Sequence, residues 1–371
     1  FSEAIEATAA LSTLVTSTAD SGPGSLRAAI ANANSAPGRQ TITFAIPVND
    51  PGHVYYRNDG AAGRVTPGNI TRTTATDDTQ IGDIDPDWPS SWWTIRPATP
   101  LPEIVETITI DGYSQPGSRR NTLPALEALN TVLKVELDGS AAGAPDGRGD
   151  GLVFGKLIGS AGIVKAKDSR VEGLTINRWQ GDGIELASLD GGNVVAGNFM
   201  GTDVSGLIGL GNQGWGLRIL DERFTMIGGT TPADRNLISG NRVGGVSMLG
   251  TSSNLLEGNN FGADRRFEFA LAGQPVAIRW ADVETVASPA TGRLAQAEQA
   301  TPPNRVVNSR FAQIVKNTEE ADSLIDIVYK KVFDRDIDVS KRVLLLYSLI
   351  RLYRPIRAQS AATSPPFLGI D

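Results

Sequence analysis

Cysteine is absent from the 371-residue chain, and histidine occurs once, at position 53. The lack of thiols excludes disulfides, zinc–thiolate sites, iron–sulfur clusters and cysteine nucleophiles. A single histidine excludes a multi-histidine metal site, and a histidine-dependent triad would have to use it. Because His53 stands in the polar run PGHVYYRND, we expect it to lie in a surface loop.

A net positive charge and long apolar runs are also lacking. The formal net charge is −7, and no basic patch is interleaved with aromatic residues, so a nucleic-acid partner is not expected. No apolar run reaches the 18 residues that a transmembrane helix needs, so no transmembrane segment is expected. The chain begins at Phe1 rather than Met, which we interpret as a sign that a leader was removed.

Glycine, in contrast, is abundant, with 41 residues. A hydrophobic content of 40% and a charged content of 20% indicate a folded globular chain. Glycine richness without low-complexity Pro-Gly sequence is typical of an all-β protein with many tight turns.

An asparagine motif recurs three times, as NVVAGN (193–198), NLISGN (236–241) and NLLEGN (254–259). The first and third copies belong to a longer repeat with a constant offset of 61 positions and no gap. Its matched pairs are Asn193 and Asn254, Asn198 and Asn259, Gly201 and Gly262, Asp203 and Asp264, Leu210 and Leu271, Gln213 and Gln274, Arg218 and Arg279.

A second motif contains glycine followed by alternating aliphatic residues, as in GDGIEL (181–186), GWGLRI (214–219) and GGVSM (244–248). Short runs with period-two alternation that are bounded by Gly and Asn predict strands. Repeats of such strands cannot bury a face alone, so they must stack on one another. The residues therefore predict a β-solenoid.

Five segments in order carry a resemblance to a known family: LVTSTADSGPGSLRAAIANAN (14–34), TITFAIP (41–47), LPEIVETITIDGYSQPGS (101–118), GNFMGTDVSG (197–206) and IGGTTPADRNLISGN (227–241). They resemble a bacterial family of extracellular right-handed parallel β-helix repeat proteins, related in architecture to pectate lyases. The resemblance covers residues 14–262, with repeat-like sequence to about 316. It implies the fold and a secreted or cell-surface location, periplasmic or extracellular.

We therefore expect an all-β chain with helical ends. A cap at 1–47 contains a short helix N-capped by Ser25 and ended by Pro37-Gly38. The remaining parts are an irregular Trp-containing insertion (48–100), the parallel β-helix (101–316), an α-helical hairpin (317–357) and a C-terminal tail (358–371).

Two non-repeating parts are candidates for contact with partners. Trp88, Trp92 and Trp93 lie within six positions in the insertion, either packed on the capping helix or exposed as a platform for a sugar or protein. The second hairpin helix is apolar nearly all round, so it must be buried, either as a cap on the solenoid or in another chain. Its candidate docking residues are Leu345, Leu346, Leu349, Ile350 and Tyr353.

For the repeated asparagines we expect an architectural role. Asn198, Asn241 and Asn259 would form one ladder of amides that satisfies buried polar groups at a coil corner. The alternative is a row of amides that contacts a substrate.

Enzyme signatures are missing where the fold would suggest them. The Gly-His-Gly motif of β-helix hydrolases and the Trp-x-Asp-His and Arg-x-Pro-x-x-Arg motifs of pectate lyases have no counterpart. Asp182, Glu185, Asp203 and Asp264 remain as candidate carboxylates, and the duplicated pair Asp203 and Asp264 favours turn formation. Asp138, Asp146 and Asp150 are weak Ca²⁺ candidates; no other cofactor is expected.

The leading hypothesis is a non-catalytic structural protein, adhesin-like or part of an extracellular assembly, that binds a protein partner or itself. The alternative is a polysaccharide-binding or polysaccharide-cleaving protein. A third is an accessory subunit of a membrane-associated complex, held by the apolar hairpin.

Overall fold

The computed structural model describes residues 11–124, 127–145, 148–155, 166–188, 191–268, 271, 274, 278–281, 305–307 and 310–311. Within these residues strands dominate, and the single α-helix is α1 (Leu26–Ser35). Strand pairing is parallel except for the two antiparallel pairings of one strand, β3. In this part of the chain no helix is long and apolar enough to cross a bilayer.

The strands form three sheets, numbered here 1 to 3 and written in order of strand pairing. Sheet 1 contains β1 (Leu14–Val15), β2 (Gln40–Phe44), β6 (Ile108–Asp111), β9 (Arg170–Glu172), β12 (Val194–Ala196), β15 (Met226–Gly228), β18 (Leu255–Glu257) and β21 (Arg305–Val307). Sheet 2 contains β22 (Arg310–Phe311), β19 (Asn260–Phe261), β16 (Leu237–Ile238), β13 (Phe199–Met200), β10 (Leu174–Asn177), β7 (Val135–Asp138), β5 (Trp92–Ile95), β3 (His53–Tyr56) and β4 (Ile70–Arg72). Sheet 3 contains β20 (Ile278–Ala281), β17 (Gly244–Leu249), β14 (Trp215–Leu220), β11 (Ile184–Leu186) and β8 (Leu152–Phe154).

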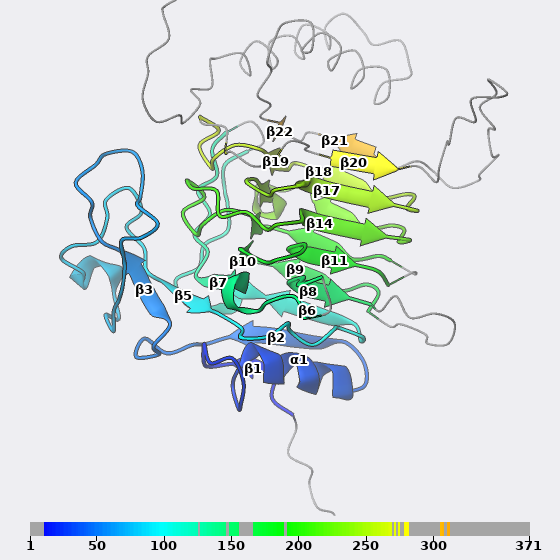
Figure 1. Cartoon of the computed structure of the whole chain (residues 1–371), viewed down its shortest axis with the longest axis horizontal. Helices are drawn as coiled ribbons and strands as arrows, with labels where there is room; N and C mark the ends of the chain where they lie inside the picture. The colour runs from blue at the N-terminus through cyan, green and yellow to red at the C-terminus, as the bar shows by residue number, and fades with distance from the viewer. Residues whose placement is uncertain are drawn as a thin grey trace, which may run out of the picture.

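From β9 onward the chain visits sheets 1, 2 and 3 in turn, and we call each such passage a coil (Figure 1). Aliphatic residues from strands of all three sheets enter one main core, as Val195 and its register partner Ile227 do on sheet 1. Neither of these side chains is exposed. Burial of such residues stabilises the fold by about 1.5–3 kcal/mol per side chain.

The 61-residue repeat corresponds to two coils. Val194 pairs with Met226 on the next strand of sheet 1, and Met226 pairs with Leu255 on the strand after it. The NVVAGN and NLLEGN copies therefore contain strands of sheet 1, β12 and β18. The NLISGN copy instead contains β16, a strand of sheet 2. Identical motifs thus serve different corners of the coil.

This difference corrects the expected asparagine ladder. At the corner before sheet 2 the stacked residues are Asn198, Asn236 and Asn259. The Asn198 backbone N–H donates to Asn236 Oδ1 at 2.8 Å, and Asn236 Nδ2 donates to Asn259 Oδ1 at 2.8 Å. The second asparagine of the middle copy, Asn241, does not belong to this ladder.

Asn241 lies instead in a second ladder, at the corner that follows sheet 2. Asn212 Nδ2 donates to Asn241 Oδ1 at 2.9 Å, and Asn241 Nδ2 donates to Gln274 Oε1 at 3.3 Å. The asparagines of both ladders are buried, and their amides are bonded to other groups of the protein; Gln274 is partly buried.

At its N-terminal end the stack is covered by α1, next to β2 (Figure 1). Ser25 caps this helix by accepting a hydrogen bond from the Ala28 backbone N–H, as the sequence predicted. The helix buries one apolar face, made of Leu26, Ala29, Ile30 and Ala33.

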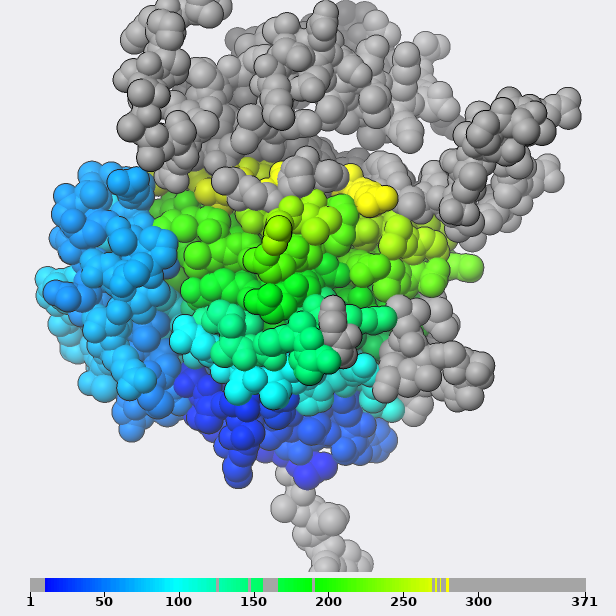
Figure 2. Space-filling view, viewed as in Figure 1, coloured from blue at the N-terminus to red at the C-terminus, as the bar shows by residue number. Residues whose placement is uncertain are grey.

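The insertion forms a lobe on one flank of the stack (Figure 2). It is less irregular than expected, because it contains β3 and β4 and contributes β5 to sheet 2 in parallel with β7. Short 3₁₀ turns punctuate the chain at η1 (Asp78–Gln80), η2 (Gly112–Ser114), η3 (Gly139–Ala141) and η4 (Pro232–Asp234). The expected hairpin (317–357) and tail (358–371) lie outside the described residues.

Substitution of the middle rung of the first ladder tests its contribution to stability. In Asn236→Ala, the Asn198 N–H, the Val195 carbonyl and Asn259 Oδ1 lose their partner in a buried site. We expect the free energy of unfolding, measured by urea titration, to fall by about 1–3 kcal/mol. The control Asn32→Ala removes one exposed amide bond to Ser12 and should change it by less than about 0.5 kcal/mol. Equal losses in the two variants would contradict this role for the ladder.

Candidate functional site

A cluster of charged side chains lies near the N-terminal ends of three strands of sheet 3, β8, β11 and β14. It consists of Asp150, Asp182 and Glu185 together with Arg148 and Arg218. Glu185 on β11 is the register partner of Arg218 on β14. Because Ile184 pairs with Leu152 of β8, the residues two positions before them, Asp182 and Asp150, also face each other across neighbouring strands.

The two aspartates connect the segments that lead into three neighbouring strands of sheet 3, β8, β11 and β14. Asp150 Oδ1 accepts the backbone N–H of Asp182 at 2.6 Å, and Asp182 Oδ1 accepts that of Trp215 at 2.6 Å. The first glycine of the Gly-x-Gly motif makes room for these carboxylates, since a Cβ at Gly214 would lie 2.1 Å from Asp182 Oδ1. The first position of the motif is therefore glycine because an aspartate carboxylate of the neighbouring segment packs against its Cα.

Burial sets the electrostatics of this cluster. It raises the pKa of Asp182 to about 6, and the nearby Asp150 carboxylate adds to the shift. Burial also raises the pKa of Glu185. Arg218 Nη1 lies 3.7 Å from Asp182 Oδ2, and Arg148 Nη1 lies 3.5 Å from Glu185 Oε1. A carboxyl group with a pKa of about 6 exchanges its proton near neutral pH.

The side chains of Asp182 and Glu185 are only 6% and 3% exposed, beneath the more exposed arginines. The sequence pointed to these two residues as candidate carboxylates, and the structure brings them together with Asp150. Arg218 was noted only as a member of the 61-residue repeat, and its pairing across strands is what identifies it as part of the cluster.

Of the other two calcium candidates, the structure describes Asp138, which is engaged by arginines outside this cluster. Asp138 bonds to Arg96 Nε at 2.6 Å and Arg178 Nε at 2.9 Å, and it also caps η3 through the Ser140 N–H. Asp146 lies outside the described residues. Among the residues that the structure describes, no three His, Cys, Asp or Glu side chains form a group that could hold a metal ion.

The repeated pair Asp203 and Asp264 closes turns. The Asp203 carboxylate accepts backbone N–H groups from Ser205, Leu207 and Ile208, and also the Tyr56 hydroxyl at 3.0 Å. Asp264 Oδ1 accepts the Glu268 N–H at 2.8 Å. Each carboxylate therefore bonds residues that follow it in the chain.

The three tryptophans of the insertion are interior residues, which corrects the expected contact platform. Trp88, Trp92 and Trp93 are 5%, 1% and 5% exposed, so no ring face is available for stacking on a sugar or a partner. Nor do all three pack on the capping helix. Trp88 and Trp92 belong to an apolar cluster with Tyr56, Val65, Val132 and Val204.

His53, expected in a surface loop, is also buried, at 1% exposure. It begins β3, and its imidazole stacks on Trp93 with ring centroids 4.1 Å apart. Nδ1 contacts the Val48 carbonyl at 2.9 Å, and Nε2 contacts Ser91 Oγ at 2.8 Å. The prediction of a surface loop was wrong because the residues that bury His53, Ser91 and Trp93, are distant from it in the sequence.

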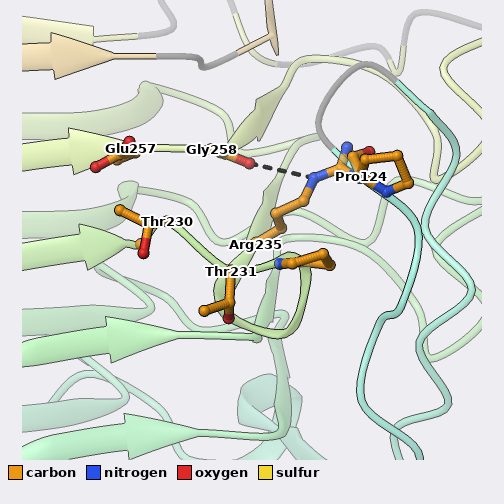
Figure 3. Close-up of a pocket in the computed structure, with 8 residues that line it drawn as sticks. Pro124, Thr230, Thr231, Arg235, Glu257 and Gly258 are labelled. Atoms are coloured by element: carbon orange, nitrogen blue, oxygen red, sulfur yellow. Dashed lines mark hydrogen bonds between the residues drawn. The ribbon is translucent and has the colours of Figure 1, made fainter.

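A recess of about 110 Å³ beside Arg235 was not predicted (Figure 3). It is lined by Pro124, Gly229, Thr230, Thr231, Pro232, Arg235, Glu257 and Gly258. It is smaller than the roughly 300–1,000 Å³ typical of sites for drug-sized ligands. Arg235 does not serve the recess as a free cation, because its guanidinium donates to five oxygens of the protein.

Arg235 and Arg265 instead hold residues 123–124 and 127–131 against the stack. Arg235 donates to the Pro124 carbonyl at 2.6 Å, and Arg265 donates to the Leu129 carbonyl at 2.7 Å from Nε. Burial lowers the pKa of each guanidinium to about 10, so both remain charged at neutral pH. The expected docking residues Leu345, Leu346, Leu349, Ile350 and Tyr353 lie outside the described residues.

Asp182→Asn tests the electrostatics of the cluster. The folded-state pKa of Asp182 lies above its ordinary value of 3.8, so its contribution to stability is complete below about pH 4 and is lost as the pH rises through about 6. The amide can still accept the Trp215 N–H. We expect the variant to exceed the wild type in free energy of unfolding by about 1–3 kcal/mol at pH 7 and to match it near pH 4. A difference that does not change with pH would contradict this assignment.

Comparison with protein-family models, with curated proteins and with solved structures found no match to this chain. Its function is therefore inferred from its own sequence and geometry.

Proposed function

We propose that the protein is a non-catalytic structural protein, built as a right-handed parallel β-helix that serves as a rigid scaffold. The proposal is supported by the hydrogen bonds of the two aspartates in the candidate site, which join neighbouring segments of the backbone. Asp150 and Asp182 each accept, through Oδ1, a backbone N–H hydrogen bond at 2.6 Å from the neighbouring segment of sheet 3. Side chains that a catalytic site would present to a substrate here join one segment of the sheet to the next.

The same use of polar side chains extends around the stack. The asparagines of both ladders are buried and bond between coils, and two buried arginines fasten residues 123–124 and 127–131 to the flank. A fold whose buried polar side chains bond to its own backbone and to one another is rigid, as a scaffold requires. From the resemblance of its sequence to extracellular β-helix repeat proteins, we propose that the protein lies outside a bacterial cell, secreted or at the surface.

Contact with a partner or with another copy is assigned to residues 317–357. The run VSKRVLLLYSLIRLYR is apolar nearly all round if helical, and such a helix must be buried on several sides. The insertion is no longer a candidate for contact through its tryptophans, because their indoles are packed inside.

Removal of residues 318–371 tests the assembly. We expect the full-length protein to show, by light scattering after gel filtration, a mass that rises with concentration above that of one chain. The truncated protein should remain folded by circular dichroism and elute as a monomer, since its docking surface is gone.

A matched pair of full-length variants refines the test. Leu345→Glu with Leu349→Glu should abolish assembly because charge on a buried helix face is costly, whereas Leu345→Met with Leu349→Met should preserve it. A full-length monomer whose truncation only unfolds the chain would show that the segment is an internal cap, and the assembly proposal would fail.

A second function, polysaccharide binding or cleavage, is favoured by one observation. Asp182 combines a pKa of about 6 with a neighbouring arginine, a pairing suited to acid–base chemistry on a sugar. We expect a screen of acidic and neutral polysaccharides, with and without Ca²⁺, to show no unsaturated or reducing products. Products that form with the wild type and disappear in Asp182→Asn would replace the scaffold proposal with an enzymatic one.

A further inference from the structure

A partly buried ion pair joins the insertion to sheet 2. Lys134 immediately precedes β7, and Asp78 begins η1 in the insertion. Lys134 Nζ lies 2.8 Å from Asp78 Oδ2 and also donates to the Ser91 carbonyl at 2.7 Å. The lysine side chain is 6% exposed and the aspartate side chain 27%. The pair therefore holds an amine nitrogen against one oxygen of a carboxyl group, largely out of water.

The other oxygen of the same carboxylate faces two donors. Asp78 Oδ1 accepts the Ser91 backbone N–H at 3.1 Å and the Ser91 hydroxyl at 2.5 Å. The Ser91 backbone N–H is a fixed donor to this oxygen, and the hydroxyl donates to it only while His53 Nε2, which contacts the same Oγ, carries a hydrogen. Donors converging on one oxygen are the arrangement that stabilises the negative charge of a tetrahedral intermediate in acyl transfer. One oxygen of the Asp78 carboxylate therefore contacts the lysine nitrogen, which is the nucleophile once it is deprotonated, and the other oxygen contacts Ser91.

The surroundings hold this arrangement in place. His53 Nε2 contacts Ser91 Oγ at 2.8 Å, and the imidazole is stacked on Trp93. Burial lowers the pKa of Lys134, although the bond to Asp78 opposes the shift. Burial also acts to raise the pKa of Asp78, but the bonds from Lys134 and Ser91 leave it below its ordinary value. The lowered pKa of Lys134 favours transfer of a proton from the ammonium to the carboxylate, and the lowered pKa of Asp78 opposes it.

We propose that Lys134 and Asp78 condense to an isopeptide crosslink that ties the insertion covalently to sheet 2. The ammonium passes one proton to Oδ2, and the resulting amine attacks Cγ. The Nζ–Cγ bond forms while negative charge gathers on Oδ1, where the two Ser91 donors stabilise it. A second proton passes from Nζ to Oδ2, the Cγ–Oδ2 bond breaks, and water leaves.

This reaction balances without a co-reactant. Both protons of the departing water come from the ammonium, Oδ1 becomes the amide oxygen, and the net charge of the pair is zero before and after. The crosslink closes the chain between residues 78 and 134, so it restricts the unfolded state and stabilises the attachment of the insertion. It does not depend on what the protein binds.

Mass spectrometry of the folded, full-length protein tests the crosslink. We expect an intact mass about 18 Da, one water, below that of the sequence, and a tryptic species in which the peptide containing Asp78 is joined to the one containing Lys134. Lys134→Arg keeps the positive charge but lacks the amine, so it should retain the full sequence mass. Asp78→Asn keeps the acyl carbon with ammonia as leaving group, so it should lose about 17 Da instead.

Ser91→Ala gives a kinetic readout. Removal of one oxyanion donor should slow the accumulation of the crosslinked mass by about tenfold or more, with the same final product. Succinimide at an Asp-Gly step also removes water, so samples are held at mildly alkaline pH, where succinimide hydrolyses and the isopeptide persists. Wild-type protein that keeps its full mass after prolonged incubation, or a loss of water that persists in Lys134→Arg, would overturn the proposal.

Discussion

Every coil must turn at the corners between its sheets, and at each turn the backbone leaves the regular ladder while remaining buried. A buried amide without a partner costs about 1–3 kcal/mol, so each corner needs a bond from outside its own strand. The side chain of the next coil supplies it. Asn236 Oδ1 accepts the Asn198 N–H, and at the corner before sheet 1 the Asn193 and Asn254 side chains accept the N–H groups of Ser169 and Thr225. Together with the hydrogen bonds between paired strands, these bonds hold successive coils in register.

The sequence identified the elements that rest on local chemistry. Period-two alternation predicted the strands, and Ser25 predicted the start of α1, because both signals lie within a few residues. It misassigned Asn241 because the three asparagine motifs are chemically alike at different corners. Only strand register shows that Asn198 stacks on Asn236, the first asparagine of the middle copy and not the second. Register depends on loops of unequal length, which the motif does not encode.

The burial of Arg235, Trp88 and His53 could not be predicted from the sequence, because the residues that cover them are distant in the chain. Arg235 follows a Thr-Pro-Ala-Asp turn, which predicts a surface residue, yet three of its five oxygen partners are carbonyls more than a hundred residues away. Trp88 and His53 lie in polar stretches whose cover comes from the 203–208 turn, the strand β5 and the serine before it. In the candidate site, Asp182 and Glu185 were visible as carboxylates, but their pairing with Asp150 and Arg218 required the alignment of three strands.

Burial acts on acids and bases of this chain in opposite directions, and the consequences differ with the partner available. Asp182 has only distant arginine nitrogens at 3.7 Å or more, so burial raises its pKa towards neutrality and leaves a destabilising charge at pH 7. Asp78 has a lysine in direct contact, which keeps it ionised while burial depresses the pKa of the lysine. An ion pair in such a site is only marginally favourable, since desolvation offsets much of the attraction. An amide in the same place carries no charge to desolvate and keeps the Ser91 donors satisfied. The geometry that makes the ion pair a weak tether for the insertion is therefore the same geometry that favours its conversion to a covalent one.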